Sequence, residues 1–236
     1  MAEAMLEVEG LRAGYGPAEI LFGVSLRLAR GEVAALMGRN GAGKSTTLKA
    51  IMGLVPPRAG RVRFAGRDIA GLAAFRIARL GLGYVPEDRR IFTDLTVAEN
   101  LEVGRRPAEG RDPWTPERLF EVFPNLASMR HRRAAAMSGG EQQMLAIART
   151  LMGNPEAVLL DEPSEGLAPV ILELMAEAVL RMKREGIAVL LSEQNFDFAA
   201  AVADRAYVIE RGEIRYDGSM VALDVDPALR AQHLSL

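Results

Sequence analysis

The 236-residue sequence has no cysteine, and only three of its 29 basic residues are lysine. Without cysteine the chain cannot form disulfide bonds, thiolate nucleophiles or zinc sites with sulfur ligands, and the reducing cytosol is its natural compartment. No apolar run approaches the roughly 18 residues that a membrane-spanning helix needs, and the acidic N-terminus has no signal-peptide pattern. A net charge of −2 gives no overall field that would attract nucleic acid or an anionic bilayer. We therefore expect a cytoplasmic protein that reaches a membrane only through a partner.

Short apolar segments recur along the chain and are separated by helical patterns. Val24, Leu26 and Leu28 alternate with other residues at the period of a half-buried strand, whereas residues 32–37 form the nearly continuous apolar run of a buried parallel strand. Further strands are expected at residues 61–64, 82–85, 157–160, 187–191 and 206–210, and helices at residues 46–52 and 170–182. This alternation predicts a largely parallel α/β core.

The middle of the chain, from about Thr96 to Leu151, has helical character. Thr96 and Glu99 match a capping box, and Thr115 followed by Pro116 matches an N-cap with proline in the first turn. This stretch predicts a helical sublobe within the α/β protein.

A phosphate-binding loop is predicted by GRNGAGKST at residues 38–46, which matches G-x-x-x-x-G-K-[ST] between a buried strand and a helix. Glycines let backbone N–H groups approach a triphosphate closely, and the following helix adds its N-terminal partial charge. Lys44 is expected to reach the β- and γ-phosphates, and the Ser45 hydroxyl to ligate Mg²⁺. Chance gives only about 0.002 such matches at this composition, so we disfavour a merely structural turn. The residues expected to bind nucleotide here are Gly38, Arg39, Asn40, Gly41, Ala42, Gly43, Lys44, Ser45 and Thr46.

Two acids follow the apolar strand at residues 157–160. Taken alone, Asp161 and Glu162 would be the polar end of an ordinary strand. With a phosphate loop upstream, we expect Asp161 to hold Mg²⁺ and Glu162 to orient or deprotonate the attacking water.

A third motif, MSGGEQQ at residues 137–143, precedes an apolar helical pattern. Ser138 and Glu141 match a capping box, which explains them structurally. A serine hydroxyl and two glycines at a helix N-terminus also form a second candidate anion site.

Together these motifs resemble those of ABC ATPases, whose LSGGQ signature corresponds to MSGGE in this chain. The resemblance covers nearly the whole chain and implies a P-loop NTPase (RecA-like) core with a mainly parallel sheet, an N-terminal antiparallel β subdomain and an inserted α-helical subdomain. It implies a single ABC ATPase domain over residues 1–236. Residues 1–87 and 152–236 would form the nucleotide-binding core, and residues from about 88 to 151 the helical subdomain.

The same resemblance implies a dimer whose two subunits pair head to tail, with ATP and Mg²⁺ between them. The signature of one subunit closes over the γ-phosphate held by the other, and Tyr15 stacks on adenine. The signature residues concerned are Ser138, Gly139, Gly140 and Glu141. Whether the second subunit is an identical copy or a sibling is left open.

Three positions depart from the usual family pattern. Glu87 replaces the glutamine that touches Mg²⁺ and the water, so it can ligate the metal but adds negative charge near the γ-phosphate. Gln194 replaces the switch histidine; its amide can donate a hydrogen bond to a phosphate oxygen but cannot titrate near neutral pH. Ala168 replaces an aspartate, which puts the inter-subunit contact at that point in doubt.

These departures occur together in one subgroup. VPEDRRIFTDLTVAENL, MSGGEQQMLAIAR, DEPSEGLAP and EQN are similar to the LivF-type subunits of branched-chain amino acid importers. This implies an ATPase on the inner face of the membrane that energises uptake through separate transmembrane permease subunits and, indirectly, a solute-binding protein. Another importer, an exporter or a lipid-pathway ATPase remains an alternative. A DNA- or ribosome-associated ABC ATPase fits less well, because the single cassette has no coiled-coil insertion, and we expect no nucleic-acid partner.

Overall fold

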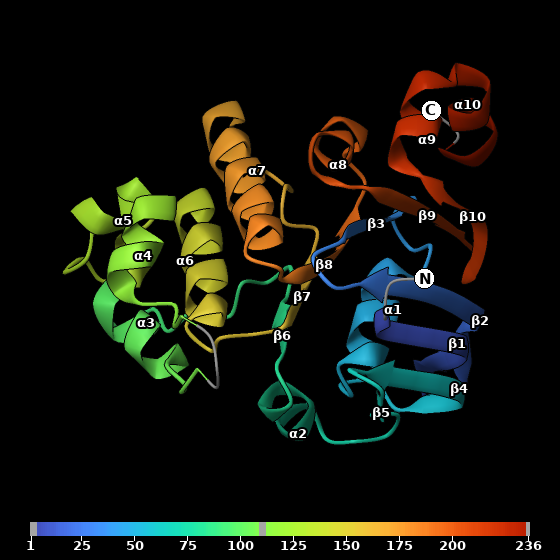
Figure 1. The fold of residues 1–236 in the computed structure, drawn as a ribbon, viewed down its shortest axis with the longest axis horizontal. Coiled ribbons are helices and arrows are strands. Elements are labelled where there is room, and N and C mark those ends of the chain that lie inside the picture. Colours follow the sequence, from blue (N-terminus) through green and yellow to red (C-terminus); the bar gives the residue numbers. More distant parts are fainter. Residues whose placement is uncertain (1–3, 109–111, 235–236) are drawn as a thin grey trace.

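The computed structural model describes residues 4–108 and 112–234, so the predicted domain limits at residues 1 and 236 lie outside the described part. Strands and helices alternate along most of the chain (Figure 1). The strands are β1 (Ala4–Tyr15), β2 (Ala18–Ala29), β3 (Val33–Met37), β4 (Pro57–Phe64), β5 (Arg67–Asp68), β6 (Leu82–Val85), β7 (Ala157–Asp161), β8 (Ala188–Glu193), β9 (Arg205–Glu210) and β10 (Glu213–Ser219). The helices are α1 (Lys44–Ile51), α2 (Ala74–Arg79), α3 (Val97–Gly104), α4 (Pro116–Val122), α5 (Pro124–Ser128), the 3₁₀ helix η1 (Ala134–Ala136), α6 (Gly139–Leu151), α7 (Pro169–Arg184), α8 (Phe196–Val202), α9 (Met220–Val225) and α10 (Pro227–Leu234).

The central sheet has six strands in the order β10-β9-β3-β8-β7-β6, and all neighbours are parallel except the β9–β10 hairpin. Alternate residues of its strands point to opposite faces and belong to two separate hydrophobic cores. Val33 and Ala35 pack with helices α6, α7 and α8, whereas Ala34 and Leu36 pack with α1 and the antiparallel sheet. Apolar layers on both faces explain why these strands read as continuous apolar runs. The predicted parallel α/β core is confirmed.

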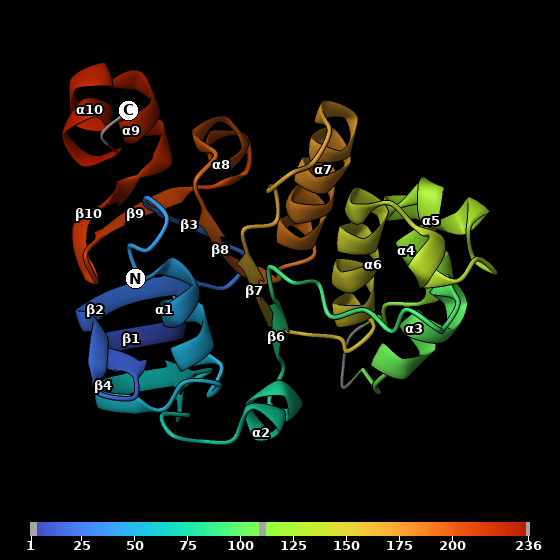
Figure 2. The same cartoon turned by 180° about the vertical axis from the view of Figure 1, so that it is seen from behind.

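The N-terminal part forms a separate antiparallel sheet in the order β2-β1-β4-β5. Its buried face carries apolar residues such as Leu6, Val8 and, beyond a β-bulge, Leu11, which pack towards α1. Figure 2 shows this sheet and the helices α3–α6 at opposite ends of the molecule, with the central sheet between them.

The helices α3, α4 and α6 begin as the sequence predicts. Thr96 and Ser138 each form a complete capping box, and Thr115 caps α4 with Pro116 in the first turn. The short helix α2 and the C-terminal helices α8–α10 were not among the predicted elements. They are six to eight residues long, which is too short for a periodic pattern to stand out. Among the described residues, no helix has both the length and the apolar character required to span a bilayer.

Candidate functional site: a phosphate loop and two acid-bearing strand ends

The loop at residues 38–43 joins β3 to α1, which begins at Lys44, two residues earlier than the sequence pattern predicts. Gly43 has φ 115°, in the region that favours glycine, and a Cβ there would lie 2.9 Å from the Leu21 side chain. A Cβ on Gly38 would lie 2.5 Å from the carbonyl oxygen of Ile209. Both glycines are therefore required for the close packing of this loop.

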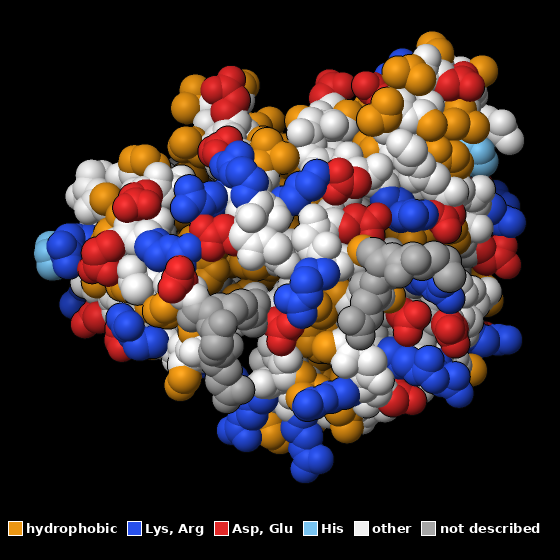
Figure 3. Space-filling view, in the orientation of Figure 1, with side chains coloured by type: hydrophobic (Ala, Val, Ile, Leu, Met, Phe, Trp, Pro, Cys, Tyr) orange, Lys and Arg blue, Asp and Glu red, His pale blue; other side chains and the backbone are white. Residues whose placement is uncertain are grey.

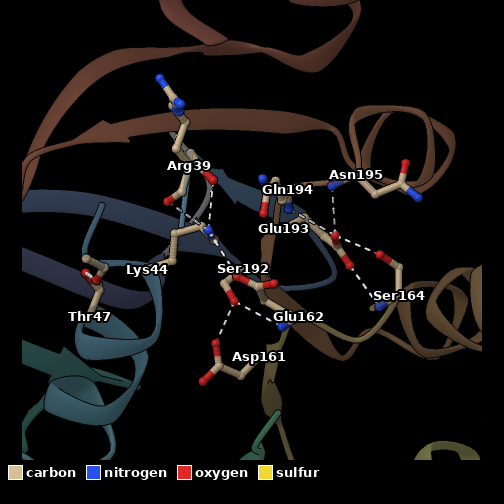
Figure 4. Close-up of polar contacts among 12 residues, drawn as sticks. Arg39, Lys44, Thr47, Asp161, Glu162, Ser164, Ser192, Glu193, Gln194 and Asn195 are labelled. Atoms are coloured by element: carbon tan, nitrogen blue, oxygen red, sulfur yellow. Dashed lines mark hydrogen bonds and ion pairs between the residues drawn. The ribbon is translucent and has the colours of Figure 1, made fainter. Parts of the chain in front are cut away.

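Lys44 is buried at the start of α1 and is held by three oxygen atoms (Figure 4). Its Nζ donates to the carbonyl oxygens of Gly38 at 2.8 Å and Arg39 at 3.2 Å, and lies 3.0 Å from Oε1 of Glu162. The structure thus brings together two residues from separate motifs. An ammonium group held at a glycine-rich loop, whose backbone N–H groups can also donate, is suited to binding a polyphosphate.

A cavity of about 370 Å³ lies against this loop. Tyr15, at the end of β1, borders it and is 49% exposed, so its ring is accessible to a ligand. Three acidic side chains, those of Glu87, Glu162 and Glu165, also line it. The predicted site residues in its lining are Tyr15, Asn40, Gly41, Gly43, Lys44, Ser45, Thr46, Glu87 and Glu162, and Ile20 and Glu165 join them.

Asp161 ends β7 and is 1% exposed. Its two carboxylate oxygens accept hydrogen bonds from the hydroxyls of Ser192, at 2.7 Å, and Tyr84, at 3.0 Å. Burial, followed by the charge of Asp161, raises the pKa of Tyr84, so the phenol stays protonated and keeps donating. Asp161 is therefore held in one orientation behind the cavity.

Glu162 has φ 46°, an unusual conformation for a residue with a side chain. Its backbone N–H donates both to the carbonyl oxygen of Ser192 and to the Ser192 hydroxyl, each at 3.1 Å. Strain of this kind costs about 1–3 kcal/mol and persists only where the surroundings fix it. The conformation carries the Glu162 side chain into the cavity beside Lys44.

Several carboxylates meet at this edge of the sheet. Burial raises the pKa of Glu87, and the nearby charges of Glu165, Glu162 and Asp161 raise it further. Such mutual repulsion is relieved when a cation binds. The described residues nevertheless contain no cluster of three or more His, Asp or Glu side chains arranged to hold a metal alone. A divalent ion here would need further oxygens, as Mg²⁺ commonly obtains from phosphate and water.

The signature residues lie elsewhere. Ser138 caps α6, and none of Ser138, Gly139, Gly140 and Glu141 borders the cavity that contains Lys44. A second cavity of about 400 Å³, lined by Glu87, Arg89, Gln142 and Glu162 among others, separates the two regions. The guanidinium of Arg89 lies against Gly139, where a Cβ would be 2.7 Å from its Nη1. Within one chain, the structure does not bring the two anion sites together.

Gln194 directly follows β8 and lies next to Glu193 (Figure 4). Its backbone N–H donates to the carboxylate of Glu193, and its side chain does not line the Lys44 cavity. Ser192 and Glu193 belong to β8, which extends two residues beyond the predicted strand end at Leu191. The sequence interpretation gave no role to Tyr84, Ser164, Ser192 or Glu193. For Ser192 and Glu193, the signal in the sequence is that two polar residues directly follow the apolar run that ends at Leu191.

A groove of about 420 Å³ separates the core from the helices α3 and α6. Its lining includes the half-exposed Leu54, Phe92 and Val103. Arg149 lies within it, with its guanidinium 5.0 Å from the Phe92 ring and Nη2 donating to the carbonyl oxygen of Arg90. Nη1 is buried and has no hydrogen-bond partner among the described residues, and burial lowers the pKa of Arg149. Figure 3 shows further basic side chains at the lower edge of the molecule, where Figure 1 places α2.

Comparisons with known proteins agree with this geometry. A family model described as ABC transporter matches residues 21–165. The high-affinity branched-chain amino acid transport ATP-binding protein BraG of Pseudomonas aeruginosa is 42% identical over 98% of this chain and 99% of its own. The lipopolysaccharide export system ATP-binding protein LptB of Haemophilus influenzae is 34% identical over 92% of this chain and 91% of its own length. A nucleotide-free ATP-binding cassette from an ABC transporter superposes with a TM-score of 0.81, at 28% identity over 96% of this chain and 97% of that one.

Proposed function

Because the chain belongs to the ABC transporter family of ATP-binding proteins, we propose that it is the ATPase subunit of an importer of branched-chain amino acids. The observation that carries the proposal is the end-to-end match to BraG together with a phosphate loop, Lys44 and Glu162 in one cavity. The chain would work at the inner face of the membrane, through separate permease subunits served by a solute-binding protein. Residues 1–87 and 152–236 would form its core, and residues from about 88 to 151 its helical subdomain.

The reaction we propose is the hydrolysis of Mg·ATP to ADP and phosphate. Tyr15 would stack on adenine, the loop at residues 38–46 would hold the phosphates, and Lys44 would contact the terminal ones. Ser45, Glu87 and Asp161 are the residues suited to Mg²⁺, which would neutralise phosphate charge. The hydroxyl and carboxylate oxygens suit this ion, and the crowded acids around Glu87 favour a cation.

Glu162 is the proposed general base. The contact between Lys44 and Glu162 suggests how its role depends on nucleotide. Phosphate oxygens compete for the Lys44 ammonium, which leaves the Glu162 carboxylate free to accept a proton from the attacking water. Gln194 would donate a hydrogen bond to the γ-phosphate. In this proposal Glu162 accepts the proton of the attacking water, whereas Gln194 binds an oxygen of the γ-phosphate.

A second subunit is required by this proposal, because the signature residues do not reach the Lys44 cavity of their own chain. Pairing head to tail would place Ser138, Gly139, Gly140 and Glu141 over the γ-phosphate of the partner subunit. ATP would then favour the closed dimer, and hydrolysis would let it separate. An identical copy and a sibling subunit both satisfy this geometry.

LptB supports a second candidate, the ATPase of a lipid exporter, at 34% identity. The two candidates can be separated by reconstitution with the membrane proteins that copurify with the tagged chain. We expect ATP-dependent uptake of leucine, isoleucine or valine into proteoliposomes, and none of glutamate. ATP-dependent extraction of lipid, without amino acid transport, would replace the importer by the exporter.

The groove between the core and α3 is the proposed docking site for a short permease helix. Val103→Arg puts a charge on its apolar wall, and desolvating that charge should weaken association with the permease by about tenfold or more. Val225→Arg is the matched control, since Val225 is also exposed but lies on α9 outside the groove. The measurement is the fraction of permease retained on the tagged subunit. Equal retention by the two variants would exclude the groove.

A further inference from the structure

The carboxylate of Glu193 joins two loops of the nucleotide site. Glu193 is the last residue of β8 and is 2% exposed. Its Oε1 accepts the backbone N–H of Ser164 at 3.0 Å, and its Oε2 accepts the Ser164 hydroxyl at 2.8 Å. Oε2 also accepts the backbone N–H groups of Gln194 at 3.1 Å and Asn195 at 3.2 Å. Four donors from the loops after β7 and β8 therefore meet at one buried carboxylate (Figure 4).

Fold stability alone does not explain a charge at this position. Burial disfavours the charged form of a carboxylate and raises the pKa of Glu193, although its four hydrogen bonds oppose the shift. An apolar side chain would end the core strand without that cost, since buried charges can often be replaced by packed apolar groups. What an apolar side chain cannot do is accept hydrogen bonds from two loops at once.

Each of the two loops carries a residue proposed for hydrolysis. Ser164 follows Glu162 by two positions, and two contacts hold the left-handed conformation of Glu162 in place. One is Ser192, which accepts the Glu162 N–H, and the other is Ser164, anchored by Glu193. Gln194 follows Glu193 directly, and its own N–H is bound to the same carboxylate. The buried carboxylate of Glu193 thus ties the two loops together, in addition to the hydrogen bonds between Glu162 and Ser192.

We propose that Glu193 is a positioning residue for ATP hydrolysis, which holds Glu162 and Gln194 in the relative placement that the reaction needs. It acts through the backbone of both loops and does not itself contact the nucleotide. The proposal rests on the ATPase function proposed above. Without Glu193, the Glu162 loop relaxes from its strained conformation and separates from the Gln194 loop.

Glu193→Gln tests the proposal, because it keeps the shape but replaces one acceptor oxygen by an NH₂ group that faces donors. We expect kcat to fall by about 10- to 100-fold, the effect of a small misplacement of a reacting group. KM for Mg·ATP should stay within about threefold, since Lys44 and Tyr15 lie on other elements. Ser164→Ala removes one donor and should lower kcat by about three- to tenfold. In the Glu193→Gln background that loss should shrink, because the two changes disrupt the same contact.

Val189→Ala is the matched control, since Val189 is fully buried on the same strand and lies outside the nucleotide site. It should lower the thermal midpoint and leave kcat within about twofold. A folded Glu193→Gln with wild-type kcat overturns the proposal, as does a kcat loss that Val189→Ala shares at equal residual stability. If Glu193→Gln does not fold, a folded Ser164→Ala with unchanged kcat overturns it. Absence of ATPase activity in the unsubstituted protein would instead refute the proposed function.

Discussion

Glu162→Gln is expected to lower ATP turnover by about 10²–10⁴-fold while Mg·ATP still binds. The amide has the shape of the carboxylate and can still orient a water, but it cannot take up the proton that the water loses. Because Glu162 projects into the cavity from a loop fixed by Ser192, the substitution should leave the loop in place. ATP that binds without being hydrolysed should also hold two subunits together, since the closed dimer is the form that binds it better.

The measurements are kcat at saturating Mg·ATP and the molar mass in solution with ATP. Glu165→Gln is the matched control, because Glu165 is an acid of the same loop and lines the same cavity. It should change kcat by less than about tenfold, as expected for a charge that only shapes the local field. Gln194→Ala removes a single proposed hydrogen bond to phosphate and should lower kcat by about tenfold.

Near-normal turnover of Glu162→Gln would show that another group accepts the proton. Glu87 would then be the next candidate, since it is the other acid of the cavity predicted from the sequence. A loss in Gln194→Ala as large as that in Glu162→Gln would contradict the division of roles between base and phosphate donor.

The parts of the site that the sequence predicts are those encoded by neighbouring residues. The phosphate loop, the acids after β7 and the capping box of Ser138 each depend on a few consecutive positions. The structure confirms the fold class and the capping boxes for the same reason, because strand and helix periods are local.

The contacts around Glu162 are not local and could not be predicted in this way. Ser192 lies 31 positions from Asp161, and their contact exists because β8 pairs with β7 in parallel register. Glu193 reaches Ser164 through the same pairing. Strand order follows from how whole layers pack, so a search for motifs passes over these residues. The left-handed conformation of Glu162 is likewise a product of its surroundings, since glycine is the residue that normally signals it.

Lys44→Met is expected to weaken Mg·ATP binding by at least about 100-fold. Each hydrogen bond from an ammonium to a phosphate contributes about 1.5–3 kcal/mol, and tenfold in affinity corresponds to about 1.4 kcal/mol. Methionine keeps an unbranched side chain in this buried position, so the change removes the charge with little loss of packing. The carbonyl oxygens of Gly38 and Arg39 lose their donor, as does the carboxylate of Glu162. Unfolding should therefore become easier by about 1–3 kcal/mol.

Lys183→Met is the matched control, because Lys183 forms a partly exposed ion pair with Asp204 at the end of α7, away from the cavity. Surface pairs of this kind contribute about 0–1 kcal/mol, so both stability and nucleotide affinity should change little. Titration calorimetry gives the affinities, and thermal unfolding without nucleotide separates lost binding from lost folding. Folded Lys44→Met that binds Mg·ATP within about threefold of the unsubstituted protein would mean that the ammonium contributes less than a single hydrogen bond. The terminal phosphates would then be held by the backbone N–H groups of the loop alone, and the exchange of Lys44 from Glu162 to phosphate would not take place.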